Sequence, residues 1–561
     1  MGRRRRIVNE IPSDSESVDG LCDSNDEDEV LDRRVDRVAP SINNLLEDEA
    51  HEEEIDDETT TTNSNKSEIW RSTSIPKTDL PFSRSHGPII PDSASSPKDI
   101  FLCLFPESLL DVIVEQTNLF ISQKKSKGDL ITKDELKIFI AINIHMGYKK
   151  LPSYRDYWSN SPQFHDSYIS SLMTVNRFGF FLSHLHINDN SKEPAKGDPE
   201  YDKLYKLRPL LDTLSETFRE CWKPSHHQAI DESMIKFKGR SSMKQYMPAK
   251  PTKRGYKVWT RADESGFVCQ FQIYTSKTDS PEKQLGARVV RDLTRDLVGH
   301  NHQVYFDNFF TGVELLISLK QDNILACGTV RSNRANLPKS DKSDKKMVIG
   351  EYEYKTSTSG LTWIKWMDKK PVYFLSNFHD PTEVTVVNRR QKDGTLTPVN
   401  SPVLCSDYNT HMGYVDYADR AISTYQIDRK SKKWWFRIFW HFIDLCICNG
   451  FILYKEKQIK PLLSLKKFRM RLVEQLVVHK IPTPKGRKRT APNTPSHAKI
   501  KVPDEKRLSN AAHMPQVSDT YKRCNHCSTR DKPQKTRWIC STCNVPLCLL
   551  PERNCFQKHH I

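Results

Sequence analysis

The sequence predicts a mixed α/β domain set between two helical segments and followed by a small metal-binding module. Three observations support this prediction. Helical periodicity gives way near residue 228 to strand-like segments that alternate with helices, and an apolar helix pattern follows them. Three aspartates, each beside aromatic residues, stand far apart within this region. Six of the 14 cysteines lie in the last 38 residues.

The charge of the 561-residue chain is distributed unevenly. Residues 1–62 contain 20 acidic residues and 7 arginines, so they carry −13, whereas the whole chain carries +15 and the remaining residues therefore carry +28. A basic body of this size favours a polyanionic partner, and nucleic acid is the commonest one. A solvated basic surface is the alternative interpretation.

No membrane partner is expected. The most apolar stretch, residues 436–454, contains Arg437, Asp444 and Asn449, which a lipid-facing helix would exclude, so we predict a buried helix. The basic N-terminus continues into acidic sequence without an apolar stretch, so no secretory signal is expected. Clustered cysteines in such a chain favour a metal site in a reducing compartment.

An acidic tail is predicted at the N-terminus. Residues 1–96 hold few aromatic residues that a core could bury, so we predict disorder. Ser13 and Ser24 each have an acidic residue three positions on, which suits an acidophilic kinase. A tail that only solvates the protein is the equal alternative.

The folded region divides by pattern into five segments. Helical spacing in Glu107–Gln123 and Lys133–Tyr148 marks the start of a helical domain. Strands alternating with helices mark the α/β domain, and polar, irregular sequence with a few strand patterns marks an inserted β-rich subdomain. The predicted bounds are 97–225 (helical, first segment), 226–332 (α/β, first segment), 333–402 (insertion), 403–425 (α/β, second segment) and 426–480 (helical, second segment).

The C-terminal segments are a basic linker, 481–520, and a cysteine-rich domain, 521–561. The linker cluster at residues 485–489 suits nuclear import or a phosphate contact, and a solvated charge run is the alternative. Each CxxC pair in the domain places two thiolates at the separation that tetrahedral zinc requires. Eight candidate ligands fit two structural Zn²⁺ ions in interleaved sites: Cys524, Cys527, Cys540, Cys543, Cys548, Cys555, His559 and His560.

Asp231, Asp307 and Asp416 predict a split carboxylate site. Isolated aspartates on converging strands and a helix suit two Mg²⁺ ions about 3.5 to 4 Å apart, which activate an attacking oxygen and stabilise the leaving one. Asp416 and Asp419 lie three residues apart at a predicted helix start, hence on one face. The alternative for each is a turn or capping residue.

The ordered motifs resemble those of piggyBac-type transposases. They are IDESMIKFKGR followed by QYMPAKPTKRGYKVW, VYFDNFF with a later GTVR, DYNTHMGYVDYAD and the cysteine module. The resemblance implies an RNase H-like catalytic domain interrupted by an insertion and flanked by a two-segment helical domain for dimerisation and DNA binding. It implies Asp231, Asp307 and Asp416 as catalytic residues, with Asp419 as a fourth carboxylate.

The implied activity is Mg²⁺-dependent cut-and-paste transposition in the nucleus, by a homodimer that cleaves double-stranded DNA at terminal inverted repeats and joins it at TTAA. The alternative is a host-adopted DNA-binding or chromatin protein that no longer transposes. A histone-reading finger is the weakest interpretation, because Trp538 alone supplies no aromatic cage.

Two basic segments are the candidate DNA contacts, because phosphate neutralisation needs such clusters. A neighbouring tryptophan suits stacking on an unpaired base, with packing as its alternative. The candidates are Lys250, Lys253, Arg254, Lys257, Arg429, Lys430, Lys432, Lys433 and Trp434. The nearby Glu232, Asp263, Glu264 and Asp428 are interpreted as surface or turn residues.

Two departures from the family pattern stand out. Tyr414 replaces a small residue beside the third aspartate, where it would perturb the metal geometry or point to solvent. The interval between Cys548 and Cys555 is long, which leaves open whether His559 or His560 is the ligand; His560 fits the family pattern better.

Overall fold

The computed structural model describes residues 68–248, 250–275, 284–390, 394–429, 431, 433–477, 499–529 and 531–561. The chain forms two compact units, divided at residue 481, and each is described by itself. The predicted tail up to residue 67, with Ser13 and Ser24, and the basic cluster at 485–489 lie outside the described residues.

A mixed β-sheet runs through the first unit. In its central part β4 pairs antiparallel with β6 and β6 with β7, whereas β4, β8 and β9 run parallel. Three antiparallel strands continued by two parallel ones are the arrangement of an RNase H-like domain, which confirms the predicted fold class. The elements are β4 (His227–Lys236), β5 (Gln245–Tyr246), β6 (Arg254–Asp263), β7 (Val268–Ile273), α9 (Leu285–Thr294), β8 (Gln303–Phe306), α10 (Val313–Gln321) and β9 (Leu325–Thr329).

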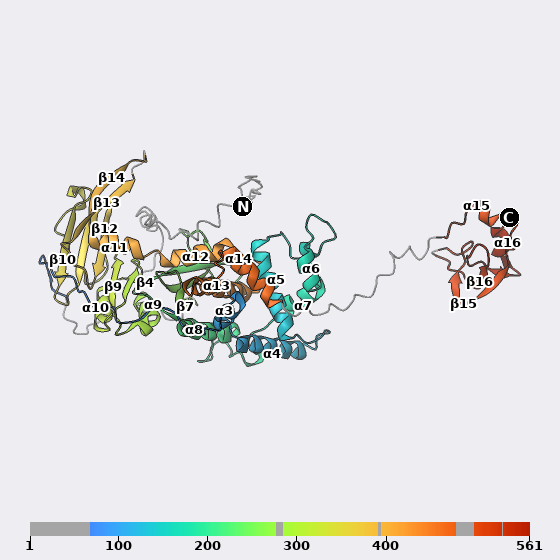
Figure 1. Ribbon diagram of the computed structural model, residues 1–561, viewed down its shortest axis with the longest axis horizontal. Coiled ribbons are helices and arrows are strands. Elements are labelled where there is room, and N and C mark those ends of the chain that lie inside the picture. Colours follow the sequence, from blue (N-terminus) through green and yellow to red (C-terminus); the bar gives the residue numbers. More distant parts are fainter. Residues whose placement is uncertain are drawn as a thin grey trace, which may run out of the picture. The chain divides into compact units, whose positions relative to one another are not determined.

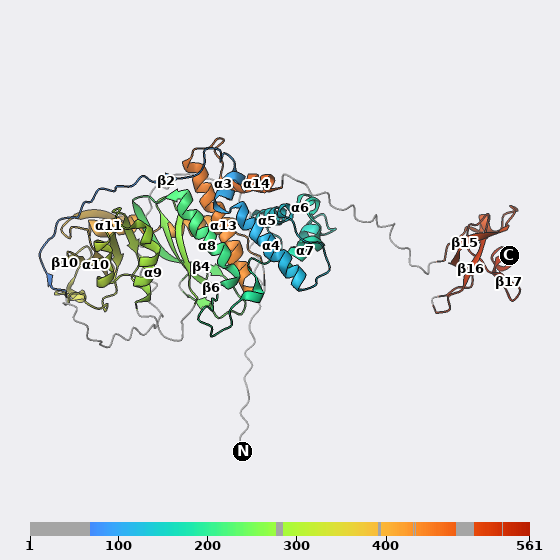
Figure 2. The same cartoon turned by 90° about the horizontal axis from the view of Figure 1, so that it is seen from below.

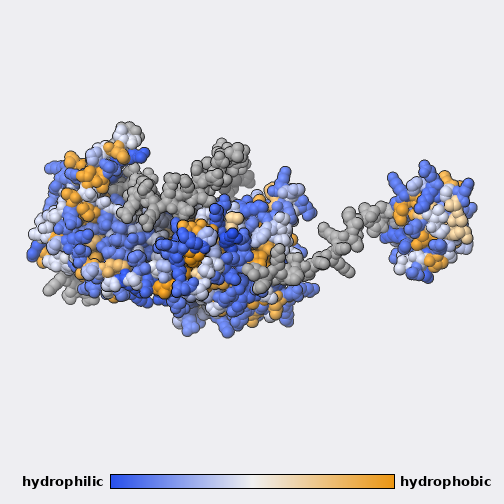
Figure 3. All heavy atoms as spheres, in the orientation of Figure 1, coloured by the Kyte–Doolittle hydropathy of each residue, from blue (hydrophilic) through white to orange (hydrophobic). Residues whose placement is uncertain are grey.

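The inserted segment builds onto the same sheet. Its strand β12 pairs antiparallel with β9, and β11, β10 and the short β1 continue outward, so the sheet has ten strands. The segment also carries a separate hairpin, β13–β14, whose exposed apolar residues give hydrophobic patches in Figure 3. The bounds are β1 (Trp70–Arg71), β10 (Tyr352–Ser357), β11 (Thr362–Met367), β12 (Pro371–Ser376), β13 (Val384–Arg390) and β14 (Leu396–Pro402).

Alternating side chains give the sheet two covered faces. Val304 and Phe306 on β8 join the core beneath α9 and α10, whereas Tyr305 between them joins the core beneath α11. Helices α11 (Val403–His411) and α12 (Tyr414–Thr424) therefore cover the face opposite to α9 and α10, as Figure 1 shows.

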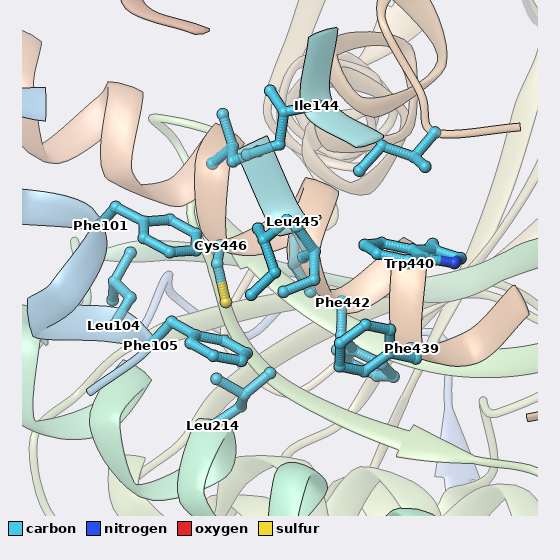
Figure 4. Packing of buried hydrophobic residues seen from close by; sticks show 14 of the residues in the cluster. Phe101, Leu104, Phe105, Ile144, Leu214, Phe439, Trp440, Phe442, Leu445 and Cys446 are labelled. Carbon is cyan, nitrogen blue, oxygen red and sulfur yellow. The ribbon is translucent and has the colours of Figure 1, made fainter. Parts of the chain in front are cut away.

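A helical layer packs beside the sheet around the long helix α13 (Trp434–Glu456). Most residues of its apolar stretch are buried, as the sequence predicts. By length and composition alone the helix would also suit a membrane span. Phe101, Leu214, Phe439 and Ile144, from four helices, meet in this core (Figure 4). The helices are α3 (Pro97–Leu104), α4 (Glu107–Gln123), α5 (Lys133–Tyr148), α6 (Ser167–Leu172), α7 (Val175–His184), α8 (Arg208–Cys221), α13 and α14 (Leu465–Leu476).

The two helical segments of the sequence thus share one core. Helix α14 packs on α3 and α5, and α13 packs on α3 (Figure 2). A buried ion pair fixes α14 to α13, with Arg469 2.9 Å from Asp444. Short elements complete this unit: β2 (Gly87–Pro88), β3 (Trp222–Lys223) and five 3-10 turns at Asp156–Trp158, Asn190–Lys192, Tyr205–Leu207, Arg295–Leu297 and Asp344–Lys346.

The second unit is small and rich in cysteine. Its core consists largely of cysteine side chains with Val545, Leu547 and Phe556, too little apolar surface to fold a domain without further constraint. Its elements are α15 (Asp504–Arg507), β15 (Pro515–Arg523), β16 (Lys535–Cys540), β17 (Leu549–Leu550), β18 (Arg553–Asn554) and α16 (Cys555–His559).

Candidate active site and metal-binding module

The register of two parallel strands brings Asp231 and Asp307 together. Ile230 on β4 is the partner of Phe306 on β8, and each is followed directly by an aspartate, Asp231 within β4 and Asp307 just after β8. Ile230 and Phe306 point into the core beneath α9 and α10, so the two carboxylates point to the opposite face. Asp231 lies within β4, which continues past this point as a partner of β6 alone.

The turn after β8 fixes the carboxylate of Asp307. Its Oδ1 accepts a hydrogen bond of 3.0 Å from the amide of Phe309, and its carbonyl accepts one of 2.8 Å from the Thr311 hydroxyl. Gly328 on β9 lies against this turn, and a Cβ there would come 2.6 Å from the carbonyl oxygen of Phe306. The glycine of the GTVR motif therefore permits the close approach that this turn requires.

Helix α12 supplies the remaining two carboxylates. It packs against β4, and Asp419 accepts a hydrogen bond from Ser233, which lies two residues beyond Asp231 on the same face of the strand. Asp416 lies in the first turn of the helix and is exposed to solvent. The structure thus gathers all four predicted carboxylates at one place, half-buried and open on the Asp416 side.

The electrostatics of the four groups show that they interact. Burial raises the pKa of Asp307, and the negative charge of Asp231 raises it further. Burial likewise raises the pKa of Asp231, against the opposing effect of Lys250, whose Nζ lies 3.7 Å away. Burial raises the pKa of Asp419 to about 7, and Asp416 adds to the shift. Carboxylates with raised pKa values hold protons near neutral pH, and binding of a divalent cation would release these protons.

Their spacing is looser than that of a closed metal site. Within the described parts of the chain, three or more ligand atoms lie within 4.8 Å of one another only in two cysteine and histidine groups. An all-oxygen donor set from short aspartates still fits Mg²⁺, which keeps waters and completes its shell with substrate phosphate oxygens.

Lys250 and Lys257, two of the predicted DNA contacts, each pair with an acidic residue of β4. Lys250 pairs with Asp231, and Asp231 is the main cause that raises the pKa of Lys250. Lys257 lies 2.8 Å from Glu232, and both side chains are about one-tenth exposed. The interpretation of Glu232 as a surface or turn residue is therefore wrong, because it lies within β4 and is largely buried. The strand pairing that brings Lys257 near it is not visible in either motif alone.

The other acidic neighbours match the interpretation as surface or turn residues: Glu264 and Asp428 are exposed, and Asp263 lies at the predicted turn. Asp263 is fully buried at the predicted turn and accepts hydrogen bonds from the Trp222 indole and the Ser225 amide. Glu264 pairs with His227, and Asp428 pairs with Arg437. All three acidic residues therefore have structural partners, and Asp263 is a buried residue of the turn.

The remaining basic candidates differ in their surroundings. Lys253 and Arg254 are exposed where β6 begins, and the guanidinium of Arg254 lies 5.0 Å from the Tyr246 ring. Arg429 instead donates to Asn143, and Lys433 donates to the carbonyls of Leu182 and Ser183.

Arg429 and Lys433 therefore tie the start of α13 to α5 and α7. Trp434 is half-buried and packs against the helical core. This agrees with the alternative interpretation that Trp434 packs in the protein and does not stack on a base. Lys430 and Lys432 lie outside the described residues. The structure does not bring Arg429, Lys433 or Trp434 to the carboxylates, and the DNA contacts remain predictions.

A polar network holds α11 in place before α12. Asp407 accepts hydrogen bonds from Tyr305 on β8 at 2.6 Å and from His379 at 3.0 Å, and it lies 3.3 Å from His411. Burial would raise the pKa of Asp407, but these hydrogen bonds outweigh it and hold the pKa well below its usual range.

Tyr414 belongs to the same network. Its hydroxyl is hydrogen-bonded to His411, and its side chain is buried, so it points neither to solvent nor between the carboxylates. The ring of His411 in turn stacks on that of His227 at 4.0 Å. The departure from the family pattern at Tyr414 thus leaves the face with Asp416 and Asp419 unblocked.

The second unit contains two groups of four potential metal ligands. Cys524, Cys527, Cys548 and Cys555 form one group, and His513, Cys540, Cys543 and His560 form the other. The groups alternate along the sequence, as in the predicted interleaved arrangement. Tetrads of sulfur and imidazole nitrogen fit tetrahedral Zn²⁺.

One ligand of the second group differs from the prediction. The ring of His513 lies 3.4 Å from the sulfurs of both Cys540 and Cys543, and that of His560 lies 3.3 Å from Cys543. His559 is absent from both groups, although its side chain was a candidate. The sequence interpretation missed His513 because it precedes the first cysteine pair by 11 residues, inside the predicted linker.

Comparison with known proteins agrees with this architecture. Residues 96–451 match the family model described as Transposase IS4. Over 463 residues the chain is 30% identical to human "PiggyBac transposable element-derived protein 3", covering 81% of this chain and 74% of that protein. It is 28% identical over 404 residues to human "PiggyBac transposable element-derived protein 2", covering 69% and 66%.

A solved structure shares the fold. It is the cryo-EM structure of a piggyBac transposase synaptic complex with hairpin DNA, with a TM-score of 0.62, 23% identity, and coverage of 83% of this chain and 98% of that chain. The converging carboxylates, the family match and the extent of the similarity to the human proteins lead to one conclusion: the chain belongs to the piggyBac-type transposases of the Transposase IS4 family.

Proposed function

We propose that the protein is a DDD transposase that cleaves and joins DNA at terminal inverted repeats in a cut-and-paste reaction at TTAA targets. One observation carries the proposal. Asp231, Asp307, Asp416 and Asp419, from two strands and a helix, meet on one open face of the RNase H-like sheet. A fold needs no such crowding for stability, because burial and like charges make it costly.

The four aspartates and Lys250 have different roles in the proposed reaction. Asp231 on β4 and Asp307 directly after β8 would be the main Mg²⁺ ligands, and Asp416 and Asp419 would complete the set from α12. Two Mg²⁺ ions would activate the attacking water or 3′-hydroxyl and stabilise the leaving oxygen. Lys250 balances the charge of Asp231 and lies where a DNA phosphate would approach the carboxylates.

The partner and the cellular setting follow from charge and similarity. The net charge of +28 beyond residue 62 supports binding to double-stranded DNA, and the structurally similar transposase was solved with hairpin DNA. We further propose that the protein acts as a homodimer in the nucleus, and that its Zn²⁺ module helps to recognise DNA next to the ends. Phosphorylation of Ser13 and Ser24 by an acidophilic kinase is part of the same proposal.

The test is joining of the gene's flanking repeat ends into a TTAA-bearing plasmid with Mg²⁺. The wild type should join the ends, and Asp307→Ala should lose about a hundredfold to a thousandfold in joining, the range found when one group that stabilises transition-state charge is removed, while binding the same DNA. Asp198→Ala, which removes an exposed carboxylate elsewhere, should join normally. Loss of DNA binding by Asp307→Ala would contradict the assignment.

A second candidate function is a DNA-binding or chromatin protein that no longer transposes. It is favoured by the names of the human relatives, which are transposable element-derived proteins. If the wild type binds the repeat ends but does not join them under any divalent cation, this candidate becomes the better account.

A further inference from the structure

Tyr408 on α11 carries a buried hydroxyl that the folded chain does not use. Its side chain is 0% exposed and packs edge-on against the Phe374 ring, with 5.6 Å between the ring centres. Its hydroxyl has no hydrogen-bond partner among the residues that the structure describes. A buried tyrosine hydroxyl usually finds a partner, because a donor left unsatisfied costs free energy. An unused hydroxyl at this place in the fold therefore calls for an explanation.

The sheet places this hydroxyl on the same face as the carboxylate of Asp307. The last paired residues of the parallel strands β8 and β9 are Phe306 and Gly328, so Asp307 and Thr329 follow at neighbouring positions. Phe306 points into the core beneath α9 and α10, so the side chains that follow it and its partner point to the opposite face. Helix α11 packs against β9 and β4 on that face and carries Tyr408 there.

The groups that act on the phenol of Tyr408 show that Asp307 is close. Burial raises the pKa of Tyr408 well above its usual range, and the charge of Asp307 raises it next most strongly. The neighbouring Thr329 lowers this pKa, and the charge of Asp231 adds a smaller increase. The phenol therefore keeps its proton and can donate a hydrogen bond.

One oxygen of the Asp307 carboxylate is available to such a donor. Its Oδ1 accepts from the Phe309 amide at 3.0 Å, and its Oδ2 has no hydrogen bond within the described part of the chain. Carboxylates that bind a metal are usually hydrogen-bonded in turn, which fixes their orientation. A neutral donor suits this role, because it does not compete with a cation for the carboxylate.

We propose that Tyr408 is a positioning residue of the metal site, whose hydroxyl donates a hydrogen bond to the Asp307 carboxylate when that carboxylate binds a divalent cation. The hydroxyl then gains the acceptor that the folded chain by itself does not give it. The proposal rests on the proposed function, since it needs Asp307 to be a metal ligand. It deepens that function, because it makes α11 part of the support of Asp307 itself.

The experiment compares Tyr408→Phe with Tyr256→Phe in the full chain. Both substitutions keep a ring that is 0% exposed and remove a hydroxyl without a hydrogen-bond partner in the described residues. No carboxylate shifts the pKa of Tyr256, so Tyr256→Phe is the matched control. Mn²⁺ is the probe in place of Mg²⁺, and electron paramagnetic resonance follows its binding. Asp307→Ala shows how much of the binding belongs to this site.

Tyr408→Phe should weaken Mn²⁺ binding about tenfold to a hundredfold, the range found when a group that orients a metal ligand is removed. Tyr256→Phe should bind Mn²⁺ as the wild type does. Without added Mn²⁺ both variants should be at least as stable to denaturant as the wild type, because neither hydroxyl has a hydrogen bond to lose. Added Mn²⁺ should then raise the unfolding midpoint of the wild type more than that of Tyr408→Phe.

The outcomes separate the two proposals. Equal Mn²⁺ affinity in Tyr408→Phe and the wild type overturns the role of Tyr408 and leaves the transposase assignment standing. A loss of stability in Tyr408→Phe without Mn²⁺, or equally weakened binding in Tyr256→Phe, overturns that role too, since either result shows a purely structural effect. Equal Mn²⁺ binding by the wild type and Asp307→Ala overturns the metal site, and both proposals with it.

Discussion

The carboxylates of Asp231, Asp307 and Asp419 cost the protein stability when they ionise together. Their pKa values are raised above the unfolded value of about 4, that of Asp419 to about 7. Protons therefore bind the folded state more tightly, so the stability that these groups contribute is complete below about pH 4 and is lost as the pH rises toward 7.

Asp307→Asn should relieve this cost. Without divalent cations we expect the variant to gain about 2 kcal/mol over the wild type at pH 8, after discounting for solvent, and almost nothing at pH 4. Thermal unfolding of both proteins between pH 4 and pH 8, with and without Mg²⁺, measures this difference in stability. Mg²⁺ should raise the melting temperature of the wild type at pH 8 and have little effect on Asp307→Asn. A gain that grows toward acid pH instead would show that Asp307 is not crowded.

His513 and His559 offer a matched pair of imidazoles in the cysteine-rich unit. His513 belongs to a ligand tetrad and His559 does not. His513→Ala should lower the zinc content of the purified protein from two ions towards one, whereas His559→Ala should leave two, because a closed site needs all four ligands. Metal analysis of both variants checks this. Loss of zinc in His559→Ala alone would restore the assignment that the sequence suggests.

The same residues show what a sequence can and cannot indicate. Asp231, Asp307 and Asp416 were predictable because each sits in a recognisable motif, and Cys524 and Cys527 because two thiolates on one turn have a fixed spacing. His513 and Glu232 were not, since their partners are brought to them by chain folding alone. No local sequence pattern identifies a single histidine such as His513 as a metal ligand. Nor does any pattern show that Glu232, next to the stronger candidate Asp231, forms a buried ion pair.

Helix α11 depends on partners that are distant in sequence. Asp407 on it connects Tyr305 of β8 with His379 and His411, and α12 with Asp416 follows directly. Removing one member of such a half-buried charged network leaves the others unsatisfied. The position of α12 over β4 therefore depends in part on a carboxylate that touches no predicted metal ligand.

Asp407→Asn should destabilise the first unit by about 2 to 4 kcal/mol, because the amide cannot accept from all three partners. We expect joining activity to fall while DNA binding is retained, since the carboxylates on α12 lose their support. Chemical denaturation and the joining assay measure the two effects. Asp292→Asn, which breaks an i,i+4 pair on α9, should cost less than about 1 kcal/mol. Equal effects of the two substitutions would rule out a special role for the network.

Elements with strong local patterns were predicted within a residue or two. The helices Glu107–Gln123 and Lys133–Tyr148 have the predicted bounds, because helical periodicity marks both, and Thr132 caps the second. The arrangement of the inserted segment was harder to predict from the sequence. Its strands were visible, but whether they form a subdomain or extend the sheet depends on the pairing of β12 with β9, which no turn or spacing determines.

The whole chain should unfold in two separate transitions. The first unit is held by a large apolar core around α13, whereas the second has little apolar core beyond its cysteines. Zinc binding then supplies most of the folding free energy of the second unit and none of that of the first, whose carboxylates are expected to bind Mg²⁺ instead. Calorimetry of the full chain should show one transition that a zinc chelator abolishes and one that it leaves in place. If the chelator shifts both transitions together, the two units fold as one and the division at residue 481 is wrong.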